Sequence, residues 1–315
     1  MRVRSQPTRR EVMVGGFAAA LATSAAGLPV SARPGSGEGI HKFVLGDLHI
    51  TILSDGIFDV PTRLLNREME QDAIEAALGG ALSASGQVQY SVNTVLVRSG
   101  AELVLIDAGA GGTWAPTVGK LADRLAAAGI DPHSITRVVV THAHPDHLWG
   151  LVDEFDNALR FANAQHTMPA PELDFWRNVS VEALPARLHG VAAGAKRVIG
   201  TIGARLAGVA PDAEIALGIA FVPTPGHTPG HCSVRLSSGP RGLIVTADTV
   251  FHPRVSFAHP EWQPVADMDG IAAVASRRRL LDMAATDRLQ IAAYHLPFPG
   301  LGRVERHGTA YRWLT

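Results

Sequence analysis

Three histidines and one aspartate stand within six consecutive residues, a density of metal-binding side chains that a solvated polar loop does not require. The segment from His142 to His147 reads HAHPDH and follows an apolar, β-type run. In a turn after a strand, His142 and His144 can point one way. Asp146 and His147 can then point another way, so that one short loop serves two adjacent metal ions. Imidazole and carboxylate ligands without thiolate suit zinc, and also manganese, iron or cobalt.

Three later segments each place a further donor at the end of an apolar run. His227 lies in the rigid turn PTPGHTPGH, Asp248 ends the run LIVTAD, and His295 ends the run IAAYH. A lone histidine at a strand end is usually structural, but an ordered series of donors at strand ends is typical of a site along one edge of an α/β sheet. The four segments together therefore predict a metal centre that is assembled from distant parts of the chain.

Strands must position these donors, and short β-type runs do alternate with longer helical stretches from His41 onward. We expect strands at 42–45, 48–53, 90–98, 102–107, 136–141, 219–223, 231–236, 241–247 and 289–294. We expect helices at 67–78, 116–128, 171–178, 182–206 and 267–285. The strands fall into two groups, roughly 42–141 and 219–294, which a helix-rich insert at 148–206 separates. Two β-rich halves covered by helices predict one layered α/β domain at 40–315.

Composition excludes several classes of protein. The chain has 315 residues, of which 46% are hydrophobic and 18% charged, so it can bury a substantial core. With 28 basic and 29 acidic side chains, it lacks the strongly basic balance of a nucleic-acid-binding protein, and we expect no nucleic acid as partner. Its single cysteine, Cys232, excludes a disulfide within the chain and a thiolate-rich zinc site.

The first 32 residues are typical of an export signal rather than of a folded domain. Arg9 and Arg10 form a twin-arginine pair ahead of an apolar run from Val12 to Leu28, and the small residues VSA end the segment at 30–32. This pattern predicts export through a translocon by the twin-arginine route, and a periplasmic or secreted protein. A retained membrane anchor is the alternative. Residues 33–39, RPGSGEG, are predicted to be a linker.

The order His-x-His-x-Asp-His, then His, Asp and His, resembles the metallo-β-lactamase fold superfamily in its dinuclear branch. The segment LVLIDAG at 103–109 is similar to the strand-end Asp-Thr-Gly motif of that superfamily, with Ala108 in place of threonine. Four shorter segments resemble its methyl parathion hydrolase-like group, which includes lactonases and arylesterases: LGD at 45–47, LSDG at 53–56, DFW at 174–176 and HLPFPG at 295–300. The resemblance covers nearly the whole chain after residue 39 and implies a four-layer αβ/βα sandwich.

The resemblance also implies a role for each donor. One ion is expected on His142, His144 and His227. A second ion is expected on Asp146, His147 and His295. Asp248 is expected to bridge the two ions, which are divalent and most typically zinc, and Asp107 to orient the His142 loop by hydrogen bonds without touching metal. His231 is not a ligand in this pattern.

Two ions about 3.5–4 Å apart can share a hydroxide, because their charge lowers the pKa of bound water toward about 7. We expect this hydroxide to attack a small-molecule ester or lactone, with organophosphate triesters as further substrates. Asp248 would hold the spacing between the ions, and Asp146 would accept a proton after the attack.

Aromatic residues near the donors indicate the kind of substrate. Trp114 and Trp176 match positions that line the pocket in the methyl parathion hydrolase-like group. Trp149 departs from the glycine that is usual there, and we expect its ring to narrow the mouth of the pocket. An apolar, aromatic pocket above two cations favours neutral substrates that carry a ring or an acyl chain. The remainder of the 182–206 insert is not assigned a role.

Two other functions fit the same fold. One is a mononuclear iron dioxygenase that acts on persulfides, in which one of the two metal sites lapses. Asp146, His147 and His295 are all present here, so the dinuclear hydrolase is favoured. The other is a non-catalytic binding protein on an inactive scaffold, which a complete set of donors disfavours. A homodimer is left open.

Overall fold

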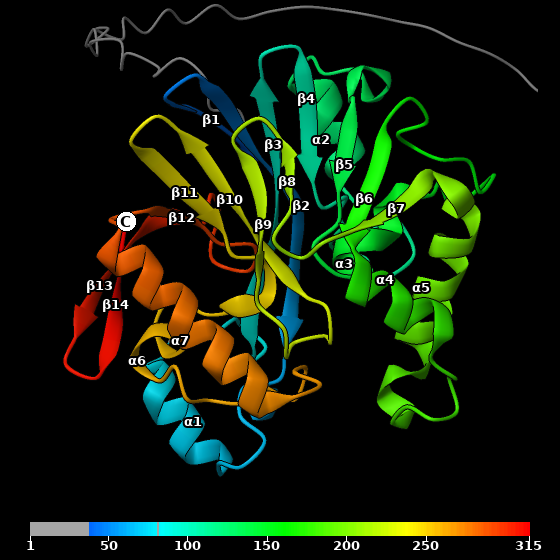
Figure 1. Ribbon diagram of the computed structural model, residues 1–315. Helices are drawn as coiled ribbons and strands as arrows, with labels where there is room; N and C mark the ends of the chain where they lie inside the picture. Colours follow the sequence, from blue (N-terminus) through cyan, green and yellow to red (C-terminus); the bar gives the residue numbers. More distant parts are fainter. Residues whose placement is uncertain (1–37, 81) are drawn as a thin grey trace, which may run out of the picture. The chain divides into compact units, whose positions relative to one another are not determined.

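The computed structural model describes residues 38–80 and 82–315, which form two seven-stranded mixed sheets between layers of helices (Figure 1). The predicted export signal at 1–32 and most of the predicted linker at 33–39 lie outside these residues. The first sheet contains, in spatial order, β1 (Ile40–Leu45), β2 (Leu48–Val60), β3 (Val88–Ser99), β4 (Glu102–Ile106), β5 (Arg137–Val139), β6 (Gln165–Pro169) and β7 (Leu206–Val209). Its first four strands are antiparallel, and β4 to β7 are parallel.

The second sheet runs, in spatial order, through β14 (Ala310–Leu314), β13 (Leu301–His307), β12 (Gln290–Ala292), β11 (Arg241–Val245), β10 (Cys232–Ser238), β9 (Ile219–Pro223) and β8 (Glu214–Ala216). Only β11 and β12 pair in parallel within this sheet.

Helices cover the outer face of each sheet. The α-helices are α1 (Gln71–Leu78), α2 (Leu121–Ala127), α3 (Pro145–Leu148), α4 (Ala170–Asn178), α5 (His189–Ile202), α6 (Val255–Ala258) and α7 (Gly270–Thr286). Short 3-10 helices occur at Thr62–Leu64, Pro132–Ser134, Trp149–Leu151, Ala186–Leu188, Gly203–Arg205 and Ala247–Thr249. Apolar side chains of α2 to α5 pack on the first sheet, and those of α6 and α7 pack on the second. The predicted helix–sheet–sheet–helix sandwich is therefore confirmed (Figure 1).

Neighbouring side chains of each central strand point to opposite faces of the sheet and pack in different layers. In β4, Leu105 packs toward the helices while Val104 and Ile106 pack toward the second sheet. In β11, Ile244 packs toward α7 while Leu243 packs between the sheets. All five side chains are fully buried, and each contributes about 1.5–3 kcal/mol to folding. Because both faces are covered, these strands are continuous apolar runs in the sequence, without alternation.

The insert at 148–206 is not purely helical. It contains β6, and it ends at β7, and these two strands extend the first sheet beyond β5. The sequence of β6, QHTMP, has one β-branched residue and ends in proline, which hides it from a strand pattern. The C-terminal hairpin of β13 and β14 was also not expected, because charged residues alternate along its exposed strands. Within the described ranges, the structure contains no helix with the length and apolar character that crossing a membrane requires.

Candidate metal centre

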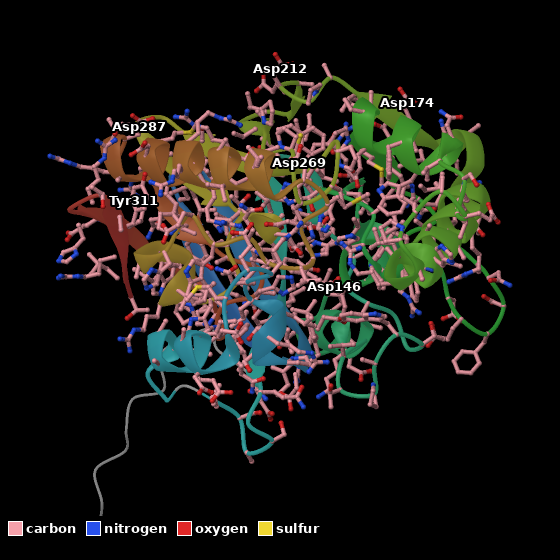
Figure 2. The ribbon with its side chains drawn as sticks, turned by 90° about the horizontal axis from the view of Figure 1, so that it is seen from below. Asp146, Asp174, Asp212, Asp269, Asp287 and Tyr311 are labelled. Atoms are coloured by element: carbon pink, nitrogen blue, oxygen red, sulfur yellow. The ribbon has the colours of Figure 1, made fainter. Side chains whose placement is uncertain are left out.

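The donor residues lie in loops that leave neighbouring strand ends of both sheets. The segment from His142 to His147 follows β5 of the first sheet. His227, Asp248 and His295 follow β9, β11 and β12 of the second sheet. All of these side chains are buried, and in the view from below the sheets Asp146 lies near the middle of the described residues (Figure 2). The structure thus brings together, at one edge of the sandwich, all seven residues that the sequence analysis proposed as ligands.

The donor atoms fall into two groups, within each of which they all lie within 4.8 Å of one another. The first group contains His142, His144, His227 and Asp248, and the second contains Asp146, His147 and His295. Asp248 faces both groups: its Oδ2 lies 3.1 Å from His227 Nε2, and its Oδ1 lies 2.9 Å from His147 Nε2. Both oxygens also lie 3.2 Å from His295 Nε2, so this one carboxylate contacts donors of both groups, as a bridging ligand requires.

Several donor atoms are buried without a hydrogen bond. Among the residues that the structure describes, Nε2 of His142, Nε2 of His147 and Oδ1 of Asp248 have no hydrogen-bond partner. His147 Nε2 and Asp248 Oδ1 are 2.9 Å apart, yet their orientation is not that of a hydrogen bond. A buried polar atom that lacks a partner costs about 1–3 kcal/mol. Two donor pairs do contact each other, His144 Nδ1 with His227 Nε2 at 2.7 Å and His295 Nε2 with Asp248 Oδ2 at 3.2 Å. The three donor atoms without a partner converge with them on common points, which fits two metal ions.

Four of the five ligand imidazoles, all except that of His144, are held at the other ring nitrogen, which fixes the nitrogen that is presented to a metal. The contacts are His142 Nδ1 with Thr141 Oγ1 at 3.1 Å, His147 Nδ1 with Asp107 Oδ2 at 2.8 Å, His227 Nδ1 with Asp267 Oδ1 at 2.9 Å, and His295 Nδ1 with the carbonyl oxygen of Ser91 at 2.8 Å.

Asp107 lies behind the ligands, as expected for an orienting residue. It accepts hydrogen bonds from the backbone N–H and the hydroxyl of Thr141, both at 2.8 Å. Its direct contact with a ligand is to His147 rather than to His142. Asp107 has φ of 59°, in the left-handed region that costs a non-glycine residue about 1 kcal/mol or more. The local strain aims its carboxylate at both ends of the HAHPDH loop.

His231 belongs to neither donor group. Its Nε2 accepts a hydrogen bond from the backbone N–H of Asp248 at 3.1 Å, and its Nδ1 lies 3.0 Å from the carbonyl oxygen of Thr224. Burial lowers the pKa of His231 to about 3, so the ring is neutral and can accept at Nε2. His231 therefore positions the bridging residue through its backbone.

Asp267 and Arg277 support the centre and were not singled out by the sequence. Asp267 holds His227, and Arg277 Nη2 lies 3.3 Å from the other oxygen of Asp267. The guanidinium of Arg277 also donates to the carbonyl oxygen of Thr249, which follows the bridging Asp248. Arg277 lies on α7. The apolar pattern of this helix predicts a buried face, but it does not indicate which polar side chain is buried there. The only sequence signal was an arginine inside that face.

A cavity of about 400 Å³ opens onto the donors. Its largely apolar wall consists of Phe58, Val60, Leu64, Tyr90, Trp114, Leu188, Val191, Phe251 and Val265, with Arg187 as the basic side chain. Trp114 lies in this wall, edge-on to Phe58 with ring centres 4.8 Å apart. The 182–206 insert supplies Arg187, Leu188 and Val191, which gives this segment a role in shaping the cavity.

Trp149 and Trp176 do not line the cavity, in contrast to the expectation from the sequence. Trp176 is completely buried in the core beneath α4 and α5, where its Nε1 donates to Glu172. The ring of Trp149 packs directly against Gly194 of α5, where a side chain at residue 194 would collide with it. Both rings stabilise the helical layer, and Phe58, Tyr90 and Phe251 form the aromatic wall in their place.

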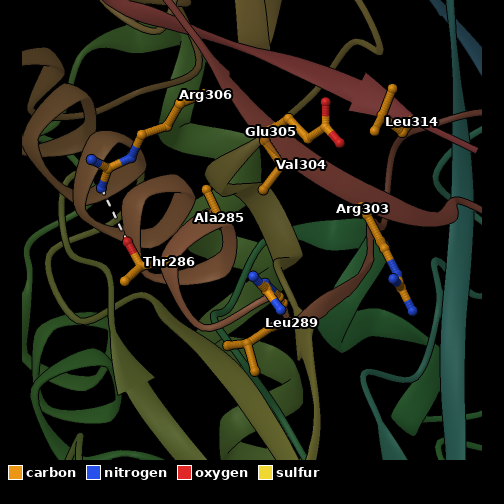
Figure 3. A pocket seen from close by; sticks show the side chains of 9 residues that line it. Ala285, Thr286, Leu289, Arg303, Val304, Glu305, Arg306 and Leu314 are labelled. Atoms are coloured by element: carbon orange, nitrogen blue, oxygen red, sulfur yellow. Dashed lines mark hydrogen bonds between the residues drawn. The ribbon is translucent and has the colours of Figure 1, made fainter.

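A second cavity, of about 500 Å³, lies away from the donors, between the end of α7 and the C-terminal hairpin (Figure 3). Arg288, Arg303 and Arg306 line it, and Arg306 donates to Thr286 Oγ1 at 3.1 Å. These side chains are exposed, and none of the proposed site residues lies here. The cavity that contains the donors is therefore the candidate active site.

Comparisons with known proteins agree with this geometry. The sequence profile of the Metallo-beta-lactamase superfamily matches residues 88–295, a span that includes every donor. A Xenopus laevis metallo-beta-lactamase domain-containing protein 1 is 26% identical over 230 residues, which are 73% of this chain and 80% of that protein.

Two solved structures are more similar. AidC, described as a dizinc quorum-quenching lactonase, is 30% identical, with 88% of this chain and 97% of AidC covered at a TM-score of 0.82. The hydrolase AbOPH is also 30% identical, with 89% and 98% covered at a TM-score of 0.82. The chain therefore belongs to the metallo-β-lactamase superfamily, as a metallo-hydrolase of its dinuclear branch.

Proposed function

We propose that this protein hydrolyses lactones and carboxylic esters that carry an apolar acyl or aryl group, with organophosphate triesters as secondary substrates. The observation that carries the proposal is the apolar cavity of about 400 Å³ that opens directly onto the two donor groups. AidC supports the lactone assignment, because its structure contains the product N-hexanoyl-L-homoserine. A six-carbon acyl chain is the kind of group that an aromatic wall accommodates.

Two divalent ions, when bound, lower the pKa of a water molecule and polarise the carbonyl oxygen of the substrate. The chain supplies the remaining functions. Asp248 sets the spacing of the two groups, because its two oxygens face different histidines. Asp146 lines the cavity beside His295, with its Oδ2 3.5 Å from His295 Nε2. Its place on the cavity wall makes Asp146 the candidate for the group that takes a proton during attack and returns it to the leaving oxygen.

The cavity wall orients the substrate and excludes water. Phe58 and Trp114 form one aromatic edge, and Tyr90 stacks against Phe251 with ring centres 6.0 Å apart. Apolar surface of this kind binds an acyl chain or an aryl ring. The carbonyl group that is attacked then points toward the donors. We propose zinc as the metal, since imidazole and carboxylate ligands suit it and AidC is a dizinc enzyme.

A substrate panel on metal-analysed protein tests the proposal. The panel contains N-acyl-homoserine lactones of increasing chain length, simple δ-lactones, p-nitrophenyl esters and diethyl p-nitrophenyl phosphate. We expect about two zinc ions per chain, and a higher kcat/KM for lactones and esters than for the phosphotriester. Chelator-treated protein should lose activity and regain it with zinc. A phosphotriester that exceeds every lactone and ester would contradict the substrate assignment, and one iron with oxygen consumption would favour the persulfide dioxygenase.

We also propose that residues 1–32 direct export by the twin-arginine route to the periplasm or the exterior. The proposal is supported by the paired arginines, the apolar run and the small residues at 30–32.

A further inference from the structure

Glu172 is a buried carboxylate that belongs to neither donor group. It lies on α4 and is completely inaccessible to solvent. Its Oε1 accepts hydrogen bonds from the backbone N–H of Ala143 at 3.0 Å and from Trp176 Nε1 at 2.6 Å. Its Oε2 accepts hydrogen bonds from Thr228 Oγ1 at 2.7 Å and from the backbone N–H of Gly230 at 2.9 Å. Both oxygens thus accept two hydrogen bonds each, none of them from a side chain of the two donor groups.

Three of the hydrogen-bond partners of Glu172 lie in two different ligand loops. Ala143 stands between His142 and His144, in the loop that follows β5 of the first sheet. Thr228 and Gly230 follow His227, in the loop after β9 of the second sheet. One carboxylate therefore ties together the two loops, from opposite sheets, that carry the three histidines of the first donor group.

The packing around this carboxylate leaves little freedom. A Cβ at Gly230 would lie 2.1 Å from the backbone nitrogen of Glu172, so the second loop rests directly on α4 and only glycine fits there. Three of the four partners are N–H groups, which can donate but not accept. The position consequently requires two acceptor oxygens. Glutamine offers one, and in either orientation its NH₂ group would face at least one N–H donor.

We propose that Glu172 is a positioning residue that sets the separation of His144 and His227 and thereby the affinity of the first metal ion. His144 Nδ1 and His227 Nε2 lie 2.7 Å apart, on the two loops that Glu172 joins. Relaxing that link changes the distance between these nitrogens, because the backbone hydrogen bond from Cys232 N–H to the carbonyl oxygen of Thr141 joins the two segments outside the loops, whereas Glu172 joins the loops themselves. The second group has supports of its own: Asp107 holds His147, the carbonyl oxygen of Ser91 holds His295, and Tyr294 Oη donates to the carbonyl oxygen of Asp146. We therefore expect it to depend much less on Glu172. The inference concerns the metal centre and is independent of which substrate is hydrolysed.

Glu172→Gln in the full-length protein tests the proposal. Zinc content is measured first on the wild type, where two ions per chain are expected, and then by chelator competition on the variant. We expect one ion to bind about 10–100-fold more weakly and the other to keep its wild-type affinity. We also expect the difference in Tm between metal-loaded and metal-free protein to shrink. A purely structural residue would lower both Tm values in parallel and leave that difference unchanged.

Asp55→Asn is the matched control. Asp55 is also a completely buried carboxylate, and it accepts three hydrogen bonds from the backbone N–H groups of Ala110, Gly119 and Leu121, all outside the ligand loops. This variant should lose Tm in both forms of the protein while it binds both ions with wild-type affinity.

Two smaller changes keep the test decisive where Glu172→Gln does not fold. Thr228→Val and Trp176→Phe each remove one hydrogen bond to Glu172, and each should weaken the first ion several-fold while the second is unaffected. Wild-type affinity for both ions in Glu172→Gln, or in both of these variants, would overturn the proposal. Fewer than two ions on the wild type would instead contradict the dinuclear centre itself.

Discussion

Asp267→Asn measures how strongly metal binding depends on a carboxylate that is not a ligand. Asp267 is fully buried between a ligand and a cation. Its Oδ1 contacts His227 Nδ1 at 2.9 Å, and its Oδ2 contacts Arg277 Nη2 at 3.3 Å. Asparagine has one oxygen, so in either orientation its NH₂ group faces His227 Nδ1–H or the guanidinium, and neither of these groups can accept a hydrogen bond.

Two magnitudes follow from this geometry. Loss of the carboxylate behind a metal-bound histidine typically weakens metal binding by about 10–100-fold, or about 1.4–2.7 kcal/mol. Loss of one partner from a buried ion pair typically costs about 3–5 kcal/mol of stability. Arg277 keeps hydrogen bonds to the carbonyl oxygens of Thr249, Pro260 and Trp262, so we expect the stability loss near about 3 kcal/mol.

Zinc competition and urea unfolding, on Asp267→Asn beside Arg277→Met, separate the two effects. Arg277→Met leaves the carboxylate next to His227, so its stability should fall by a similar amount while its zinc affinity falls less than about tenfold. Asp267→Asn should lose both stability and affinity. Wild-type zinc affinity in Asp267→Asn would refute the assignment of Asp267 as the group that orients His227.

Four further predictions follow from the same geometry and sequence. Asp248→Ala should abolish hydrolysis and lower the content of both ions. His231→Ala should keep two ions per chain, because His231 bonds only to the backbone of Asp248. Metal analysis of the two variants tests this prediction. Trp114→Ala should raise KM for aryl esters about tenfold through the loss of an aromatic contact, whereas Trp149→Phe should lower stability and leave KM unchanged. Burial and the charge of Arg205 lower the pKa of His166 from 6.5 to about 4, so the neutral ring contributes stability above pH 6.5 that is lost as pH falls through 4. Between about pH 7 and about pH 4, the free energy of unfolding in urea should therefore fall by about 3 kcal/mol more for the wild type than for His166→Leu. Equal losses in the two proteins would contradict this prediction. Arg9→Lys together with Arg10→Lys should retain folded precursor inside the cell, and N-terminal sequencing of the exported wild type should start near Arg33; an intact Met1 on a membrane-bound product would show an anchor instead.

The donor residues could be proposed from the sequence because their signal is local. HAHPDH places four metal-binding side chains in six residues, and the other donors stand directly after apolar runs. Parallel strand ends lie at a common edge of a sheet, so donors in those loops come together once the fold is known. The layered architecture was predictable for the same reason, since continuous apolar runs such as that of β4 indicate strands that are covered on both faces.

The supporting residues could not be proposed in this way. Glu172, His231 and Arg277 form hydrogen bonds to backbone groups. Every residue has such groups, so the partner of this kind of bond cannot be recognised from the sequence. Asp267 lies 40 residues after the histidine that it holds. Trp149 and Trp176 show a different limit, because a large aromatic side chain suits both a core and a pocket wall. Packing against Gly194 and the bond to Glu172 place them in the core.

Charge provides an independent argument about how many ions the centre is built to hold. Five buried carboxylates form or directly support it: Asp107, Asp146, Glu172, Asp248 and Asp267. Arg277 is the guanidinium buried among them, so the ionised groups carry a formal charge of −4. Each buried charge without a compensating charge costs several kcal/mol, and several such charges would exceed the whole free energy of unfolding of an ordinary fold. Two divalent ions supply four positive charges, so that with the shared hydroxide the centre carries a formal charge of −1. A single divalent iron would leave a formal charge of −2, or −3 with a bound hydroxide, so the carboxylates around the donors favour a dinuclear hydrolase over a mononuclear dioxygenase.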